Sequence, residues 1–433
     1  MKNYAQVIEY LFAQLPMFTR DGASAIQFDH DNTRLLCTAL GNPQDKFKSV
    51  HIAGTNGKGS SSHMLASVLR TSGLKTGLYT SPHLVDFRER IRINGAMIPE
   101  ENVVEFFHKN KVLIDSIKPS FFELTVAMAF DYFAKEKVDI AIIEVGLGGR
   151  LDSTNIIRPE LCLISNIGLD HMNILGDTLI EIAQEKAGII KNGVPVVISE
   201  KQEELVQVFE DKAAQAKTEL IFASDRYLIK EVERELDGLH MIITNLIAQA
   251  DFAMITDLAG SYQQKNILGV LTCLDKLREL GYSISDTEIQ YGLSHVQQET
   301  GFRGRWETLS AIPWVICDTG HNEDGIKTVV ENLSNLNYNR LHFLFGAMRD
   351  KDLSHILPLL PKDALFYFVA PKMPRALPSV ELTDLALSYG LKGSSFQDVS
   401  SGFSAASTKY LPGDLIFVGG STFVVAELLT NHF

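Results

Sequence analysis

A glycine-rich loop between an apolar run and a helical pattern constrains the fold of this chain most. Residues 49–53 are mostly apolar, and the stretch H-I-A-G-T-N-G-K-G-S covers 51–60. A strand, a glycine loop and a helix in this order form a unit of parallel α/β folds, in which the N–H groups of the loop face phosphate oxygens. We predict phosphate binding by Gly54, Thr55, Asn56, Gly57, Lys58, Gly59 and Ser60.

The loop departs from the common motif G-x-x-x-x-G-K-[ST]. Ile52 stands at the position of the first glycine, and Gly59 separates Lys58 from the first hydroxyl, at Ser60. A glycine turn whose lysine has no catalytic role is therefore the alternative interpretation. The strand before the loop and the helix after it favour phosphate binding.

Apolar runs alternate with helical patterns along most of the chain, which is typical of mostly parallel α/β sheets. In the first part, strands are predicted near 49–53, 139–145, 161–167 and 194–199, with an antiparallel excursion over 227–257 and a helix over 263–281. A second α/β pattern follows, with strands near 313–317, 341–346, 364–370 and 414–418 and helices near 324–336 and from 422. We expect two domains, 1–298 and 299–433.

The composition argues against several classes of protein. The 433 residues are 45% hydrophobic and 21% charged, as in globular proteins. A formal net charge of -13 argues against nucleic acid or an anionic membrane as the main partner, because both need a basic surface. The sequence has neither a run of membrane-spanning length nor the apolar block of a signal peptide. We expect a cytoplasmic protein in which Cys37, Cys162, Cys273 and Cys317 are buried free thiols.

Two oxygen-bearing side chains lie at predicted strand ends in the first half. Ser81 belongs to T-S-P-H (80–83), which by itself is compatible with an ordinary turn, and Glu144 lies within an apolar strand beside a run of glycines. A carboxylate in such a strand is costly unless it is compensated. A buried ion pair is one explanation for Glu144. We favour a Mg²⁺ ligand, because Mg²⁺ needs few protein oxygens when phosphates supply the rest.

His171 and Lys186 are further candidates. His171 ends L-D-H (169–171), after the strand predicted over 161–167, and is predicted to be a metal ligand or a polar contact. Lys186 lies on the apolar side of a short helix. Three roles remain open for Lys186: a snorkelling side chain, a desolvated nucleophile or base, and a carbamate formed with CO₂ that supplies oxygen to a metal.

In the second half, charged residues again follow predicted strands or lie near the domain boundary. Arg305, in G-F-R-G-R-W-E (301–307), is placed to reach phosphates. Asp318 ends a strand and His321 follows it in D-T-G-H-N (318–322). Such an end can hold a ribose or a phosphate, whereas a solvated basic turn and a plain strand–turn–helix unit are the alternatives.

Taken in order, these motifs resemble the Mur ligase superfamily, and within it the folylpolyglutamate synthase/dihydrofolate synthase family of the bacterial bifunctional type. The resemblance is carried by G-T-N-G-K-G-S (54–60), T-S-P-H (80–83), E-V-G-L-G-G-R-L-D-S-T-N (144–155), L-D-H (169–171), E-K-A-G-I-I-K (185–191) and D-T-G-H-N (318–322). It implies a P-loop-type ATPase domain followed by a smaller, Rossmann-like glutamate-ligase domain. Arg303 stands where the family usually has proline in F-P-G-R, so the stiffness of that loop is expected to differ.

The resemblance also implies roles for the candidate residues. Ser81 and Glu144 would bind one Mg²⁺, and Glu144, His171 and a carbamate on Lys186 a second. A monovalent cation is an additional expected ion. The ATP contacts would include Asn266, Arg305 and Asp318, and the catalytic residues would be Lys58, Lys186, His171 and His321.

The pterin end of a folate substrate is expected near residues 28–33, 120–123 and 151–153. The first of these stretches departs most from the bacterial pattern. The residues expected to contact the substrate are Asp29, His30, Asp31, Asn32, Ser120, Leu151 and Ser153.

The implied reaction is ATP-dependent amide formation through an acyl phosphate. We expect a monomer whose partners are ATP, L-glutamate and dihydropteroate or a reduced folate, with both acceptors used. Two alternatives are a peptidoglycan-precursor ligase and a non-catalytic ATP-binding regulator. Too little chain precedes Gly54 for the UDP-binding domain of the former, and the joint presence of Lys58, Glu144, His171 and Lys186 argues against the latter.

Overall fold

The computed structural model describes residues 3–22, 29–235, 237–349 and 351–433. These residues form two compact units. The first unit extends to Asp257 and resumes over Tyr262–Phe302, and the second comprises Leu258–Ser261 and Arg303–Phe433. By their contacts, residues 299–302 therefore group with the first unit and residues 258–261 with the second.

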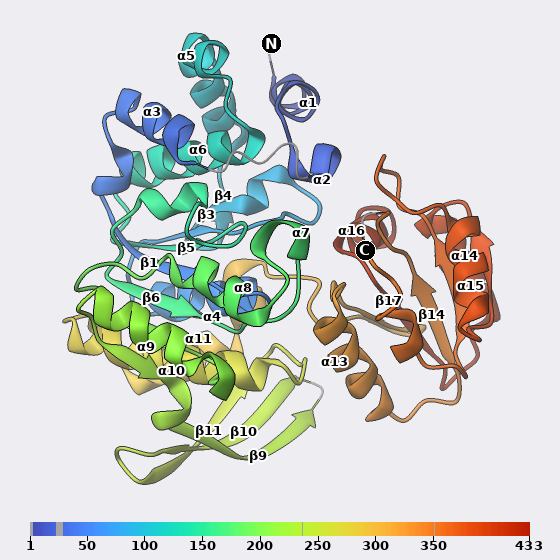
Figure 1. Cartoon of the computed structure of the whole chain (residues 1–433). Helices are drawn as coiled ribbons and strands as arrows, with labels where there is room; N and C mark the ends of the chain where they lie inside the picture. The colour runs from blue at the N-terminus through green and yellow to red at the C-terminus, as the bar shows by residue number, and fades with distance from the viewer. Residues whose placement is uncertain (1–2, 23–28, 236, 350) are drawn as a thin grey trace. The chain divides into compact units, whose positions relative to one another are not determined.

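The first unit is built on an eight-stranded sheet in the order β4-β3-β2-β5-β1-β6-β7-β8 (Figure 1). In this order, β2, β5, β1, β6, β7 and β8 pair in parallel, each with the next. At the other end of the sheet, β3 pairs antiparallel with both β2 and β4. The strands are β1 (Lys48–Ala53), β2 (Thr76–Tyr79), β3 (Ile91–Ile93), β4 (Ala96–Met97), β5 (Ile140–Glu144), β6 (Leu161–Ile164), β7 (Val196–Ile198) and β8 (Leu220–Phe222). The apolar runs of the sequence thus correctly predicted the central strands, which are buried on both faces.

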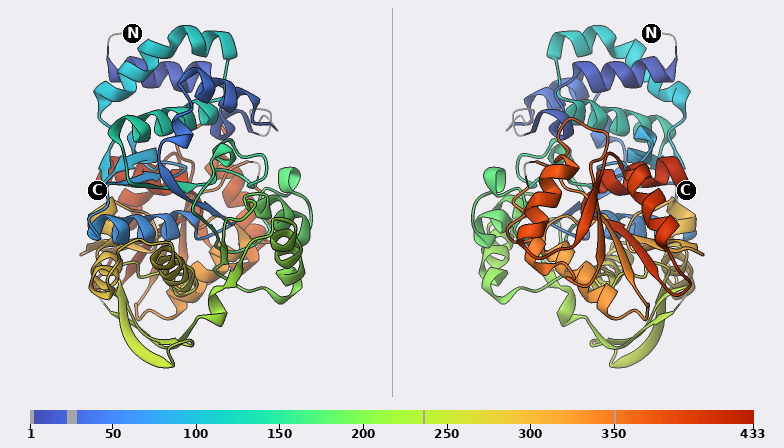
Figure 2. Two further views of the ribbon diagram at one scale, coloured as in Figure 1. Left: turned by 90° about the vertical axis from the view of Figure 1, so that its left-hand side faces the viewer. Right: turned by 90° about the vertical axis from the view of Figure 1, so that its right-hand side faces the viewer.

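Helices cover both faces of this sheet and form a further layer beside it (Figures 1 and 2). On one face, α4 contacts β2, β5, α10 and α11. On the other, α6 packs through an apolar core shared with α1, α3 and α5, while α8 and α9 pack over β6 and β7. The helices of the first unit are α1 (Tyr4–Gln14), α2 (Phe18–Asp21), α3 (Asp31–Ala39), α4 (Lys58–Thr71), α5 (Glu100–Ile117), α6 (Phe121–Glu136), α7 (Met172–Leu175), α8 (Leu179–Ala187), α9 (Val206–Gln215), α10 (Gln263–Glu279), α11 (Asp286–Ser294) and α12 (Val296–Thr300).

Side-chain caps begin two of the helices that position the site. Ser120 and Glu123 form a capping box at α6, and Thr178 and Glu181 form one at α8. The predicted antiparallel excursion is a three-stranded sheet in the order β11-β10-β9, formed by β9 (Tyr227–Glu235), β10 (Gly238–Asn245) and β11 (Ala250–Thr256). This sheet belongs to the first unit, and α10 follows in the same unit after residues 258–261.

The second unit has its own six-stranded sheet, in the order β12-β13-β17-β14-β15-β16. All pairs are parallel except the hairpin of β12 and β13. Rings of Phe343, Phe366 and Phe417 pack together in its core. The elements are β12 (Glu307–Ala311), β13 (Trp314–Cys317), β14 (Leu341–Phe345), β15 (Leu365–Val369), β16 (Gly393–Phe396), β17 (Leu415–Gly419), α13 (Glu323–Ser334), α14 (Ser379–Ser388), α15 (Val399–Lys409) and α16 (Thr422–His432).

The α/β class predicted from the sequence is confirmed, although β8, β12, β16 and the short β3–β4 hairpin were not predicted. The four cysteines are buried and free, as expected. None of the helices in the described ranges combines the length and the apolar character needed to cross a bilayer.

Candidate functional site

Two glycines of the predicted phosphate loop cannot be replaced without a clash. The loop joins β1 to α4, and Gly54 and Gly57 have φ values of +146° and +85°. A Cβ at Gly54 would lie 1.9 Å from Oγ of Ser165, and one at Gly57 would lie 2.2 Å from Oδ1 of Asn266. The loop is therefore enclosed by β6 on one side and by α10 on the other.

The end of β6 fixes the loop backbone. The amides of Thr55 and Asn56 donate to the backbone oxygen and the side-chain Oδ1 of Asn166, at 2.9 and 2.8 Å. The Thr55 hydroxyl bonds to the backbone of Gly168. Sequence analysis missed Asn166, although a polar residue directly after an apolar strand was the available signal.

A second missed residue connects the loop to α10. Gln263 donates through Nε2 to Oγ of Ser60 at 3.1 Å and accepts through Oε1 from Nδ2 of Asn266 at 2.8 Å. The structure thus places Asn266, which the resemblance assigns to the ATP contacts, beside the loop.

Two lysine ammonium groups meet at one carbonyl of the loop. Nζ of Lys58 lies 3.0 Å from the Gly54 oxygen and 3.1 Å from that of Thr55, and Nζ of Lys186 lies 2.9 Å from the same Gly54 oxygen. Lys186 is only 3% exposed, on the inner side of α8. Burial, reinforced by the charge of Lys58, lowers the pKa of Lys186 to about 7. The snorkelling interpretation of Lys186 is therefore wrong.

Glu144 and Ser81 lie side by side at the ends of neighbouring parallel strands. The Ser81 amide donates to Oε2 of Glu144 at 2.9 Å, and Glu144 is 4% exposed. A Cβ placed on Gly59 would lie 3.7 Å from Oε1 of Glu144. The buried carboxylate therefore faces the first turn of α4, beside the loop.

This arrangement fits Mg²⁺ better than a metal that needs many protein ligands. In the described part of the chain, no three His, Cys, Asp or Glu side chains gather as a metal site. Mg²⁺ binds through one or two carboxylates and completes its shell with water and phosphate oxygens. Glu144, with Ser81 next to it and a side-chain-free position at Gly59, offers such a place.

His171 lies near the carboxyl end of β6, at the start of the short helix α7. Its φ of +52° is unusual for a residue with a side chain, and its Nε2 lies 3.8 Å from Oδ2 of Asp170. Asp170 is also one of the charges that act on Lys186. Sequence analysis did not single out Asp170, although it stands in the L-D-H motif.

The three stretches predicted to hold the pterin are connected. Nδ2 of Asn32 donates to Oε2 of Glu123 at 3.3 Å, and the Ser120 amide donates to the same oxygen at 2.6 Å. Burial lowers the pKa of His30, and a hydrogen bond with the Asp152 backbone opposes the shift. Residues 29–32, 120–123 and 151–153 are thus neighbours, whereas Phe28 lies outside the described residues.

The other residues of these stretches have local roles in the structure. Asp29 accepts the Asp31 amide at 2.9 Å, Leu151 is half-buried, and Ser153 is buried at the start of a 3₁₀ turn. Nearby, a Cβ on Gly146 would lie 2.3 Å from Cζ of Phe122, so this glycine leaves room for the aromatic ring.

In the second unit, Asp318 organises its own loop. It is 3% exposed, and its oxygens accept the amides of Trp306 at 2.8 Å and Gly320 at 2.6 Å. These bonds hold the segment of Arg305, which is half-buried, against the end of β13. His321 follows in the same loop and donates through Nδ1 to the Thr319 carbonyl at 3.1 Å.

The turn before Arg305 is bonded to the carboxylate of Glu307. Glu307 accepts from Nε of Arg303 at 2.8 Å and from the Gly304 amide at 2.6 Å. The ion pair restrains the turn in which the family usually has proline.

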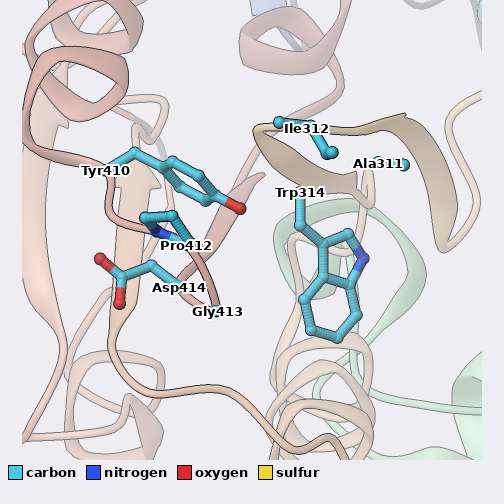
Figure 3. Close-up of a pocket in the computed structure, with 7 residues that line it drawn as sticks. All are labelled: Ala311, Ile312, Trp314, Tyr410, Pro412, Gly413 and Asp414. Carbon is cyan, nitrogen blue, oxygen red and sulfur yellow. The ribbon is translucent and has the colours of Figure 1, made fainter.

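A pocket of about 350 Å³ lies elsewhere in the second unit (Figure 3). Trp314 and Tyr410 stand on its two sides, and Asp414 borders it. These residues lie at the amino ends of β13 and β17, whereas Asp318 follows the carboxyl end of β13. The pocket is therefore separate from the candidate site of this unit.

Two family profiles match the chain. The Mur ligase middle domain matches residues 52–274, and the Mur ligase glutamate ligase domain matches residues 304–422. The dihydrofolate synthase/folylpolyglutamate synthase of Bacillus subtilis is 33% identical over 403 residues, or 91% of this chain and 92% of the relative. The folylpolyglutamate synthase of Lacticaseibacillus casei is 31% identical over 440 residues, or 98% of each.

Solved structures of folylpolyglutamate synthases resemble this chain over nearly its whole length. E. coli FolC in complex with DHPP and ADP superposes with a TM-score of 0.86 at 27% identity, over 99% of this chain and 97% of that chain. Folylpolyglutamate synthase of Mycobacterium tuberculosis complexed with ADP superposes with a TM-score of 0.87 at 25% identity, over the same shares.

Proposed function

Because the chain belongs to the Mur ligase family, and within it to the folylpolyglutamate and dihydrofolate synthases, we propose that it joins L-glutamate to both dihydropteroate and reduced folates. The protein is an ATP-dependent ligase. The observation that carries the proposal is the phosphate loop, where Lys58 and Lys186 share the Gly54 carbonyl and the Glu144 carboxylate lies beside Gly59.

In the first step, the γ-phosphoryl group of ATP passes to the acceptor carboxylate and leaves ADP. The loop amides hold the phosphates, and Lys58 exchanges its carbonyl partners for the transferring group. Mg²⁺ held by Glu144 and Ser81 supplies charge neutralisation when it is bound. We assign the nucleotide contacts of the second unit to Arg305, Asp318 and His321.

In the second step, the amine of L-glutamate attacks the acyl phosphate, an amide forms and phosphate leaves. The acyl phosphate must be protected from water at this stage. We place the pterin end of the acceptor among residues 29–32, 120–123 and 151–153, where Asn32 and Ser120 converge on Glu123.

Lys186 is proposed to react with CO₂. The neutral amine forms an N–C bond to CO₂ and one N–H proton leaves to solvent, so that a carbamate anion replaces the neutral amine. The pKa of about 7 supports this reaction, because a large fraction of the amine is neutral near pH 7. With Glu144 and His171, the carbamate would provide oxygen and nitrogen for a second Mg²⁺. We further propose that the protein binds a monovalent cation, is a monomer and is located in the cytoplasm.

Phosphate release from ATP tests the function. The assay contains L-glutamate and Mg²⁺ and compares dihydropteroate, tetrahydrofolate, a UDP-sugar peptide and no acceptor. Release with both acceptors supports the bifunctional proposal, and release with one assigns a single activity. Release only with a UDP-sugar peptide, or with none of these acceptors, contradicts it.

A further inference from the structure

The chain enters the second unit next to a residue that packs on the phosphate loop. The first unit ends at Phe302, and from Arg303 onward the chain belongs to the second unit. We call residues 299–305, which run from the end of α12 to Arg305, the crossing segment.

Hydrogen bonds fix the start of the crossing segment to α4, the helix that follows the phosphate loop. Nδ1 of His63 lies 2.7 Å from Oγ1 of Thr300, and both residues are buried. The Thr300 hydroxyl donates its one proton to the Val296 carbonyl at 2.6 Å, so His63 is the donor in the first bond. About two helical turns further along α4, Arg70 forms an ion pair with Glu299 at 2.8 Å and donates to its backbone oxygen at 2.5 Å.

The ring of Phe302 lies between His63 of α4 and the phosphate loop. It stacks on the His63 ring with centroids 4.3 Å apart and an interplanar angle of 29°. A Cβ on Gly59 would lie 3.8 Å from Cε2 of Phe302 and 3.7 Å from Oε1 of Glu144. The Phe302 ring and the Glu144 carboxylate therefore both adjoin the same loop residue, which carries no side chain.

We propose that Phe302, held by His63, is a positioning residue that couples nucleotide binding at the phosphate loop to the crossing segment. The inference rests on the proposed function, because it requires that residues 54–60 bind ATP and ADP. Nucleotide binding at the loop changes the surroundings of Gly59, and the packed ring passes this change to the backbone that leads to Arg305. The coupling is reciprocal, so the packing of Phe302 also affects nucleotide affinity.

Hydrogen exchange of the full-length protein, with and without ADP and Mg²⁺, tests the coupling. In the native protein, ADP is expected to slow exchange in peptides covering 54–60 and, by about fivefold or more, in those covering 299–305. In Phe302→Leu, protection of 54–60 remains and protection of 299–305 is lost. Phe252→Leu is the control, because Phe252 is also a half-buried phenylalanine of the first unit with an aromatic partner, Tyr227.

The outcomes separate this inference from the proposed function. If ADP fails to protect 54–60 in the native protein, nucleotide binding at the loop is wrong. If it protects 54–60 but not 299–305, or if Phe302→Leu keeps the protection of 299–305, the coupling is wrong. Should Phe302→Leu not fold, Thr300→Val removes the oxygen that His63 contacts at nearly constant volume, and the same loss at 299–305 is expected.

Discussion

The ammonium nitrogen of Lys186 lies 2.9 Å from the carbonyl oxygen of Gly54, although 132 residues separate the two in the sequence. Nζ of Lys58 lies 3.0 Å from the same oxygen. The burial of Lys186, reinforced by the like charge of Lys58, accounts for its lowered pKa. A lysine that would be a permanent cation at the surface is here a partly neutral amine at the phosphate loop.

Replacing Lys186 by Ala or by Arg is expected to abolish ligase activity, with a loss of about 100-fold or more. Arginine keeps a positive charge but cannot form the carbamate. The measurement is acceptor-dependent phosphate release. Lys276→Arg is the control, since the side chain of Lys276, on α10, is 14% exposed but forms ion pairs with Glu219 and Glu279. Normal activity of Lys186→Arg would show that no carbamate is needed.

Gly59→Ala is expected to leave the melting temperature nearly unchanged and to lower kcat/KM for ATP by about tenfold or more. The new methyl group makes ordinary contacts at 3.7 Å with Glu144 and 3.8 Å with Phe302, but it fills the space in which phosphate and Mg²⁺ are proposed to approach. Thermal unfolding and ATP-dependent kinetics measure the two effects. An unchanged kcat/KM would argue against this placement of the phosphates.

Gly57→Ala, two residues earlier, is expected to behave differently. Its Cβ would lie 2.2 Å from Oδ1 of Asn266, at a φ of +85°. We expect a loss of about 1–3 kcal/mol in the free energy of unfolding, measured by urea titration, in addition to lost activity. Stability equal to that of Gly59→Ala would show that the loop relaxes to avoid the clash.

Glu144→Gln is expected to raise the Mg²⁺ concentration needed for half-maximal activity by about tenfold or more. The amide oxygen can still accept the Ser81 amide, so the fold should persist while the negative charge is lost. The measurement is a Mg²⁺ titration of phosphate release at saturating ATP, with circular dichroism as the check on folding. An unchanged Mg²⁺ dependence would remove Glu144 from the metal site.

Acid destabilisation is expected to depend on His83. Nδ1 of His83 accepts from Nε of Arg90 at 2.8 Å, and burial, followed by the Arg90 charge, lowers its pKa to about 3. An unfolded histidine titrates near pH 6.5. Between these values the unfolded chain binds the proton and the folded chain does not, so this contribution to stability is present above pH 6.5 and is lost as the pH falls.

His83→Asn keeps an acceptor for Arg90 and removes the titration. From pH 7.5 to pH 5, the native protein should lose about 2 kcal/mol more unfolding free energy than His83→Asn. Urea unfolding at the two pH values measures the difference. Equal losses would mean that His83 is not a source of the acid sensitivity.

The positions of the predicted residues follow most directly from the sequence where they belong to one local motif. Residues 54–60 and Ser81 follow strands and Glu144 ends one, and parallel strands bring their carboxyl ends to one edge of the sheet. Asn166 and Gln263 were missed because their partners, Asn56 and Ser60, are 110 and 203 residues away in the sequence. No local periodicity predicts such pairs.

By itself, the sequence determined the strand–loop–helix units, the α/β class and the residue types available at each strand end, because these depend on short-range periodicity and on the conformations that glycine permits. Only the tertiary structure decided what the polar groups do. In the folded chain, the oxygens of Asp318 accept two backbone amides, Lys186 is buried beside Lys58, and the ring of Phe302 lies beside Gly59 of the phosphate loop. The physical reason is that burial and electrostatic contact depend on which distant segments pack together, and these packing partners set both the pKa of an amine and the hydrogen bonds left to a carboxylate.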